Sequence, residues 1–155
     1  MSPHRFRMPL HRVELSCTPG PLGKAATLPA SRCHAILGME PEASSLAAAI
    51  DSDGVRLMSA ASILEASVVL AGRHGPLGVQ KLDEFVRKAG IDVVPVTLEQ
   101  AEAGRAGFRR FGKGRHPAGL NFGDCFAYGL ATTAKQALLF KGADFARSDV
   151  TAAPW

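Results

Sequence analysis

The stretch VRLMSAASILEASVVLAGRHG, residues 55–75, changes character after its first five positions. Residues 55–59 are short and mostly apolar, which predicts a buried strand. A helix is then expected from about Ala60 until Gly75 and Pro76 end it. A strand that passes directly into a helix is half of a β–α–β unit, so this stretch favours an α/β fold.

The rest of the chain repeats this alternation. We expect further strands over 91–96 and 137–140, and further helices over 42–50, 77–89, 98–111 and 120–133. The helix that reaches about Phe111 opens with a capping signature, Thr97 followed three places later by Gln100. Short apolar strands alternating with helices predict a mostly parallel sheet covered on both faces, with functional sites at the carboxyl ends of the strands.

Length and composition fit one globular domain. The chain has 155 residues, 46% of them apolar, and a formal net charge of +4. Its three cysteines, Cys17, Cys33 and Cys125, form no CxxC pair, so neither a disulfide framework nor a zinc knuckle is indicated. No run of about 18 apolar residues and no secretory signal is present, which disfavours membrane insertion and export and indicates a cytoplasmic protein.

The first 26 residues differ from the remainder. They mix Arg, His, Pro and Gly without a period of 2 or 3.6 residues. We therefore expect an irregular, poorly ordered leader over 1–26 and a folded domain over 27–155.

Asp124 is a charged residue in a stretch that otherwise predicts a packed helix, 120–133. One interpretation is a capping acid, because Asn121 precedes it by three positions and an acid in a first turn satisfies free N–H groups. The other is an inward-facing carboxylate, because its helical neighbours Ala127, Tyr128 and Ala131 are not solvent-loving.

Two further acids repeat this pattern. Glu65 shares a helix face with Ser62, Val68 and Val69, and Asp144 comes just past the carboxyl end of the strand expected at 137–140. Half-buried carboxylates are costly unless a positive charge neutralises them. An oxygen-only set without suitably spaced His or Cys indicates Mg²⁺ or Mn²⁺, ions that commonly act on phosphate esters.

A basic segment directly precedes the Asp124 helix. It contains Arg109, Arg110, Lys113, Arg115 and His116. Such charges either hold a polyanion over the metal or only solvate a turn. The segment does not match a phosphate-binding glycine loop.

Three segments together resemble PIN-domain ribonucleases of the VapC toxin type: residues 59–78 (SAASILEASVVLAGRHGPLG), 111–131 (FGKGRHPAGLNFGDCFAYGLA) and 138–150 (LLFKGADFARSDV). The similarity extends from about Leu37 to Ala152. It implies a three-layer α/β/α sandwich with a central, mostly parallel sheet. It also implies a metal-dependent endoribonuclease that cuts RNA such as tRNA or rRNA, is inhibited by a cognate VapB-type antitoxin and forms homodimers or toxin–antitoxin hetero-oligomers.

The resemblance also assigns residues. It places Glu65, Asp124 and Asp144 as the metal-binding and catalytic acids, and Asn121 as the polar residue that accompanies Asp124. With the basic segment, the residues expected to bind substrate are Asn121, Arg110, Lys113 and Arg115.

The sequence departs from the family at its first acid. Such toxins open with a strand that ends in a metal-binding Asp, but counting back from the family's Glu-Pro-Glu segment, here at 40–42, places Pro29 at that position. An altered 5′ coding end is one explanation. Two hypotheses follow: an active but impaired ribonuclease, or an inactive member that keeps antitoxin or RNA binding. A third, a metabolic enzyme in which these acids only cap helices, also remains open at this stage.

Overall fold

The computed structural model describes residues 26–38, 54–140 and 142–154. Its sheet has four strands in the order β3-β2-β1-β4, and every neighbouring pair is parallel. The strands are β1 (Ala26–Thr27), β2 (Arg56–Ser59), β3 (Ile91–Val94) and β4 (Ala137–Leu138). The expectation of a parallel sheet is therefore confirmed.

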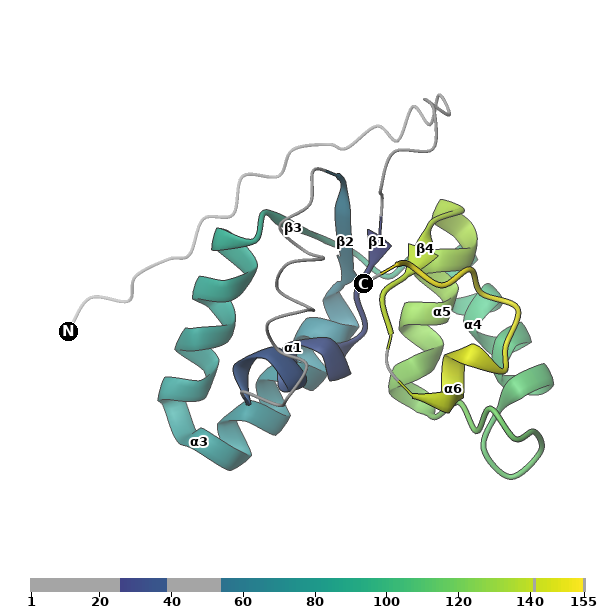
Figure 1. The fold of residues 1–155 in the computed structure, drawn as a ribbon, viewed down its shortest axis with the longest axis horizontal. Coiled ribbons are helices and arrows are strands. Elements are labelled where there is room, and N and C mark those ends of the chain that lie inside the picture. The colour runs from purple at the N-terminus through teal and green to yellow at the C-terminus, as the bar shows by residue number, and fades with distance from the viewer. Residues whose placement is uncertain (1–25, 39–53, 141, 155) are drawn as a thin grey trace.

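Helices cover both faces of this sheet (Figure 1). They are α1 (Ala30–Leu37), α3 (Ala60–Lys88), α4 (Leu98–Phe111), α5 (Phe122–Ala134) and α6 (Ala143–Ala146). Consecutive residues of β4 and its continuation enter two different cores, Leu138 with α4, α5 and α6 and Leu139 with α1 and α3. This alternation is the period of a strand buried on both sides, and it gives the three-layer sandwich that the resemblance implied.

The long helix α3 joins the two helices expected at 60–74 and 77–89. Gly75 interrupts it with φ 62° and ψ −156°, a conformation open to glycine and not to other residues. Pro76 follows immediately, where it starts the second half of the helix. The predicted break is therefore a kink between two continuous helical arms.

Other boundaries differ from expectation for local reasons. The strand expected over 91–96 ends at Val94, and the helix expected from Leu120 begins at Phe122, because Leu120 bridges to Gly112 and Asn121 caps the helix. Ala26, assigned to the leader, already pairs with β2 and β4. The remaining leader and the helix expected over 42–50 lie outside the described residues.

The chain returns to β4 near its carboxyl end. The Leu138 N–H donates to the Thr151 carbonyl at 2.8 Å, and the Ala153 N–H donates to the Leu138 carbonyl at 2.9 Å. These bonds flank a parallel bridge between Leu138 and Ala152, and α6 lies in the chain between these two residues. Within the described ranges, no helix is long and apolar enough to cross a membrane.

Candidate functional site

The three predicted acids come from three elements that begin near the carboxyl edge of the sheet. Strand β2 runs directly into α3, whose N-cap Ser59 accepts a hydrogen bond from the Ala61 N–H, and Glu65 lies in the second turn. Strand β4 leads to α6, which carries Asp144. Asp124 lies in the first turn of α5, which packs on β1, β2 and β4.

Glu65 meets the first turn of α5 at Gly123. A Cβ atom at position 123 would collide with both carboxylate oxygens of Glu65. A side chain at this point would push the Glu65 carboxylate aside, and that carboxylate lies one residue away from Asp124 along the backbone of α5. This contact links the two helices that carry these acids.

Asp124 performs the capping role that its spacing predicted. Its Oδ2 accepts from the Asn121 N–H at 2.9 Å, and Asn121 Oδ1 accepts from the Asp124 N–H at 3.0 Å. The two residues form a reciprocal capping box. Capping does not exhaust the role of Asp124, because its charge also interacts with both other acids.

The carboxylates repel one another. Burial, followed by the charge of Asp124, raises the pKa of Glu65. Burial likewise raises the pKa of Asp124, with a further rise from the charge of Asp144, although the hydrogen bond from the Asn121 backbone opposes the shift. Asp124 is thus the central member of a row of three acids, and a cation among them would relieve the repulsion.

The row is not a closed cage. In the part of the chain that the structure describes, no group of three His, Cys, Asp or Glu side chains is arranged to hold a metal ion. Asp144 is exposed, whereas Glu65 and Asp124 are half-buried. The oxygen-only donor set still fits Mg²⁺ or Mn²⁺, which retain water ligands and need few protein carboxylates.

Pro29 lies at the end of β1, the strand between β2 and β4. It is buried and forms the N-cap of α1, where it makes no side-chain capping bond. Neighbouring strands β2 and β4 lead toward Glu65 and Asp144, so the position between them contributes no carboxylate. The missing acid inferred from the sequence therefore falls at the centre of the carboxyl edge.

The basic segment begins in the last turn of α4, with Arg109 and Arg110, and continues into a closed loop between α4 and α5. Leu120 and Lys113 bond back across it, with the Lys113 N–H donating to the Leu120 carbonyl at 2.9 Å. The guanidinium of Arg115 lies over the Phe108 ring at 5.9 Å, and Lys113 is exposed. Since Asn121 directly follows the loop and is itself exposed, these groups border the first turn of α5.

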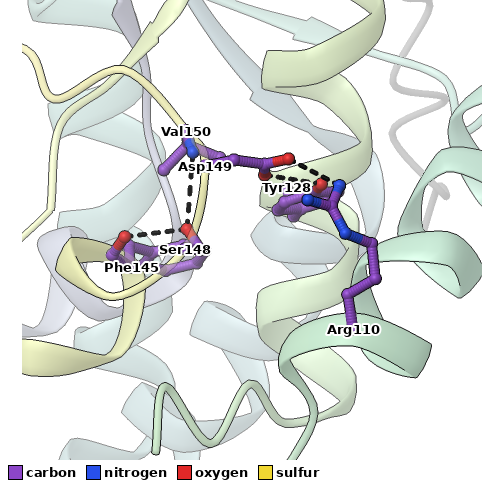
Figure 2. Close-up of polar contacts among 6 residues, drawn as sticks. All are labelled: Arg110, Tyr128, Phe145, Ser148, Asp149 and Val150. Carbon is purple, nitrogen blue, oxygen red and sulfur yellow. Dashed lines mark hydrogen bonds and ion pairs between the residues drawn. The ribbon is translucent and has the colours of Figure 1, made fainter. Parts of the chain in front are cut away.

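Arg110 has a different environment from the other basic residues (Figure 2). Its Nη1 lies 2.6 Å from Asp149 Oδ2, and the hydroxyl of Tyr128 donates to Asp149 Oδ1 at 2.8 Å. The guanidinium also lies 4.6 Å from the centre of the Phe111 ring. Arg110, which the sequence predicts to bind substrate, thus pairs with an acid of the same chain, and its side chain remains 59% exposed.

Sequence reasoning missed three residues of this region: Gly123, Tyr128 and Asp149. The sequence offers one signal for Gly123: glycine in the first turn of a helix lowers helix stability, so its presence indicates that a neighbouring group approaches closely there. Tyr128 is the only tyrosine of the chain, and its pairing with Asp149 spans 21 positions. No local pattern marks such a contact.

The described cysteines are neutral thiols. Burial raises the pKa of Cys33 to about 12, and it raises that of Cys125, with a further rise from Asp124. The Cys125 Sγ lies 3.1 Å from the Asn121 carbonyl, to which it donates. A thiolate nucleophile beside Asp124 is therefore disfavoured, as expected.

Sequence comparisons relate this chain to known proteins. The PIN-domain family model matches residues 30–150. Ribonuclease VapC30 of Mycobacterium tuberculosis is 50% identical over 116 residues, which are 75% of this chain and 88% of that protein. Ribonuclease VapC of Mycolicibacterium smegmatis is 49% identical over 118 residues, covering 76% of this chain and 92% of its own.

Two solved structures share the fold. Mycobacterium tuberculosis VapC20, described as a sarcin–ricin loop cleaving toxin, aligns with a TM-score of 0.66 and 15% identity over 81% of this chain and 96% of its own. VapBC2 of Rickettsia felis, bound to a DNA fragment from its promoter, aligns with a TM-score of 0.65 and 11% identity over 83% and 96%. At these identities the likeness concerns the fold alone.

Proposed function

Since the chain belongs to the PIN-domain family and is a VapC-type endoribonuclease of the toxin–antitoxin class, we propose that it cuts RNA with a Mg²⁺ or Mn²⁺ ion held by Glu65, Asp124 and Asp144. The contact of the Glu65 carboxylate with the first turn of α5, beside Asp124, is the observation that carries this proposal. The raised pKa of each of these two acids supports it, because a cation would offset their repulsion.

The roles divide among the chain's own groups. Glu65 and Asp124 hold the ion, and Asp144 orients the ion or the attacking water. Such an ion, when bound, supplies positive charge to the scissile phosphate and activates a water. Asn121, Lys113 and Arg115 bind the RNA backbone near the first turn of α5. The sequence also predicts Arg110 as a substrate-binding residue.

Partners follow from the family. We propose a cognate VapB-type antitoxin as inhibitor, tRNA or rRNA as substrate, and a homodimer or a toxin–antitoxin hetero-oligomer acting in the cytoplasm. The named relatives are VapC ribonucleases, and one structural relative is a VapBC complex.

A second candidate is a PIN-fold protein with impaired or absent catalysis that retains antitoxin or RNA binding. Buried Pro29 at the end of the central strand β1 favours it, because this edge position offers no ligand to the ion. Such a protein keeps the fold and lacks one carboxylate at the proposed ion site. The two candidates therefore differ only in turnover.

Cleavage of total RNA by the purified protein, with Mg²⁺ or Mn²⁺ and with a chelator, tests the proposal. Cleavage should need the ion and should fall by at least about 100-fold in Asp124→Asn, as expected when a charge-stabilising group is removed from a catalytic site. Asp83→Asn removes an exposed acid of α3 outside the site and should cut normally. Equal residual cleavage in Asp124→Asn and the unaltered protein would contradict the ribonuclease proposal and leave the impaired alternative.

A further inference from the structure

Asp144 lies on an element that cannot hold its own position. Helix α6 has four residues, and its N-cap Gly142 makes no side-chain capping bond. Isolated helices of this length are unstable in water, because nucleation is not repaid by enough hydrogen bonds. The direction of Asp144 must therefore be set by contacts that the surrounding segment makes with the rest of the protein.

The segment that carries Asp144 has one apolar anchor and two hydrogen bonds within itself. Phe145, next to Asp144, is only 3% exposed and packs in the core between α4, α5 and β4. The Ser148 hydroxyl donates to the Phe145 carbonyl at 2.7 Å and accepts from the Val150 N–H at 3.5 Å (Figure 2). These bonds fold the segment into a compact turn, but they do not connect it to the helix that carries Asp124.

Phe145 gives the segment an apolar contact with that helix, and Asp149 adds a polar one. One carboxylate oxygen accepts from the Tyr128 hydroxyl at 2.8 Å, and the other lies 2.6 Å from the Arg110 guanidinium (Figure 2). Tyr128 lies on α5 four residues, or about one turn, after Asp124, so both side chains lie on the same face of the helix. A carboxylate five residues after Asp144 is thus fastened to the helix that presents Asp124.

The connection combines a buried ring with an exposed ion pair. The side chains of Arg110 and Asp149 are 59% and 45% exposed, whereas Tyr128 is 4% exposed. Desolvation opposes the ionised form of Asp149, but the hydrogen bonds from Tyr128 and Arg110 outweigh it and lower the pKa of Asp149. The Tyr128 ring packs so closely on α4 that a Cβ at Gly107 would collide with it, so the Tyr128 hydroxyl is the better fixed of the two partners of Asp149.

We propose that Asp149, bound by Tyr128 and Arg110, is a positioning residue that keeps Asp144 beside Asp124. The inference rests on the proposed function, because it takes Asp144 as a ligand of the ion. It also reassigns Arg110, which orients the site from within the protein and does not contact the RNA.

The test measures Mn²⁺ binding directly, by the electron paramagnetic resonance signal of free Mn²⁺, in the purified full-length chain. Tyr128→Phe removes one hydroxyl and leaves the ring, and it should weaken Mn²⁺ binding roughly 2- to 10-fold, the worth of one hydrogen bond. The matched control is Glu84→Gln, which breaks an ion pair of the same 2.6 Å length on the surface of α3 and should leave binding unchanged. Unchanged binding in Tyr128→Phe would overturn the inference.

A double variant separates positioning from general loosening. If the Tyr128 hydroxyl acts through Asp144, the variant Tyr128→Phe/Asp144→Asn should bind Mn²⁺ no more weakly than Asp144→Asn alone. Additive losses would show that Tyr128 acts elsewhere and would overturn the inference while leaving the metal site intact. Mn²⁺ binding by Asp144→Asn equal to that of the unaltered chain would instead show that Asp144 is no ligand, which contradicts the proposed function itself and the inference with it.

Discussion

Gly123 and Asp124 show how much chemistry one helical turn can carry. Within a single turn of α5, Asn121 closes the capping box, Gly123 admits the carboxylate of Glu65, and Asp124 both caps the helix and faces two other acids. Each residue type is explained by a different physical demand. Glycine has a low helix propensity, but at position 123 its missing side chain leaves the space in which the Glu65 carboxylate approaches Asp124.

We predict that Gly123→Ala is damaging. The added methyl must displace the Glu65 carboxylate, which is the movable end of its side chain, so we expect little change in the free energy of unfolding but a loss of cleavage, because that carboxylate moves away from Asp124. Gly72→Ala is the control: nothing lies within 4 Å of its Cβ position, and alanine there should stabilise α3 by about 0.5–1 kcal/mol without changing cleavage. Cleavage assays and urea unfolding of both variants measure this, and unchanged cleavage by Gly123→Ala would contradict the close approach.

Asp124 also predicts a pH dependence. Its pKa is raised in the folded protein, mainly by burial, so the folded state retains a proton that the unfolded state releases. The carboxylate therefore destabilises the metal-free protein increasingly as pH rises from the ordinary aspartate value of about 4 through the raised one. Without metal, Asp124→Asn should become more stable relative to the unaltered chain as pH rises over this window.

Unfolding measured in chelator at several pH values checks this. The variant keeps an amide oxygen for the Asn121 N–H, so the helix cap is retained and the charge is the main change. Added Mn²⁺ should reverse the order, because an ion that binds only the folded, unaltered protein stabilises it. A constant difference across the pH series would mean that capping alone explains Asp124.

At the scale of elements, β1 and α1 are the pair that the sequence pattern alone did not reveal. Strand β1 has two residues, and two residues carry no period, so neither this strand nor the helix that follows it was expected from the pattern. The longer elements α3, α4 and α5 were predictable because their stop and start signals, Gly75, Thr97 and Asn121, act locally. The contacts that the sequence could not predict are those between elements far apart along the chain.

Pro29 at the junction of β1 and α1 gives the sharpest prediction for an element. Its φ of −80° and ψ of 160° suit an N-cap aspartate, so Pro29→Asp should fold and cap α1 while adding a carboxylate at the central strand end. We expect Mn²⁺ binding tighter by roughly tenfold or more, since affinity follows the number of charged ligands, and faster RNA cleavage.

The control for that variant is Pro29→Asn. It supplies the same capping shape without the charge, so any gain in stability should be shared, but the gain in Mn²⁺ affinity should not. Calorimetric titration with Mn²⁺ distinguishes the two. If both variants bind the ion like the unaltered chain, position 29 does not face the acids.

At the scale of the whole molecule, charge is divided between acids at the site and the basic loop beside it. The formal net charge is +4, and Arg109, Lys113 and Arg115 lie in or next to the loop between α4 and α5. Arg110, predicted to share their role, pairs with Asp149 across 39 positions, a contact that no sequence pattern indicates. The sequence could thus locate the basic residues but could not predict which of them form ion pairs with acids of the same chain.

Salt dependence separates these charges. Lys113→Ala and Arg115→Ala should each weaken binding to single-stranded RNA in chelator and lower the slope of log affinity against log salt by about 0.7. Arg73→Ala removes an exposed charge of α3 outside the loop and should leave the slope unchanged. A filter-binding series at several salt concentrations measures this, and equal slopes in all variants would exclude the loop as an RNA contact.

The two separate cores have a consequence for control of the enzyme. Glu65 belongs to the helix packed in one core, whereas Asp124 and Asp144 belong to elements packed in the other. Sliding of α3 along α5 by a fraction of an ångström would part Glu65 from Asp124 without unfolding either layer. We therefore expect a small shear between the layers to weaken the proposed ion site while leaving both cores intact.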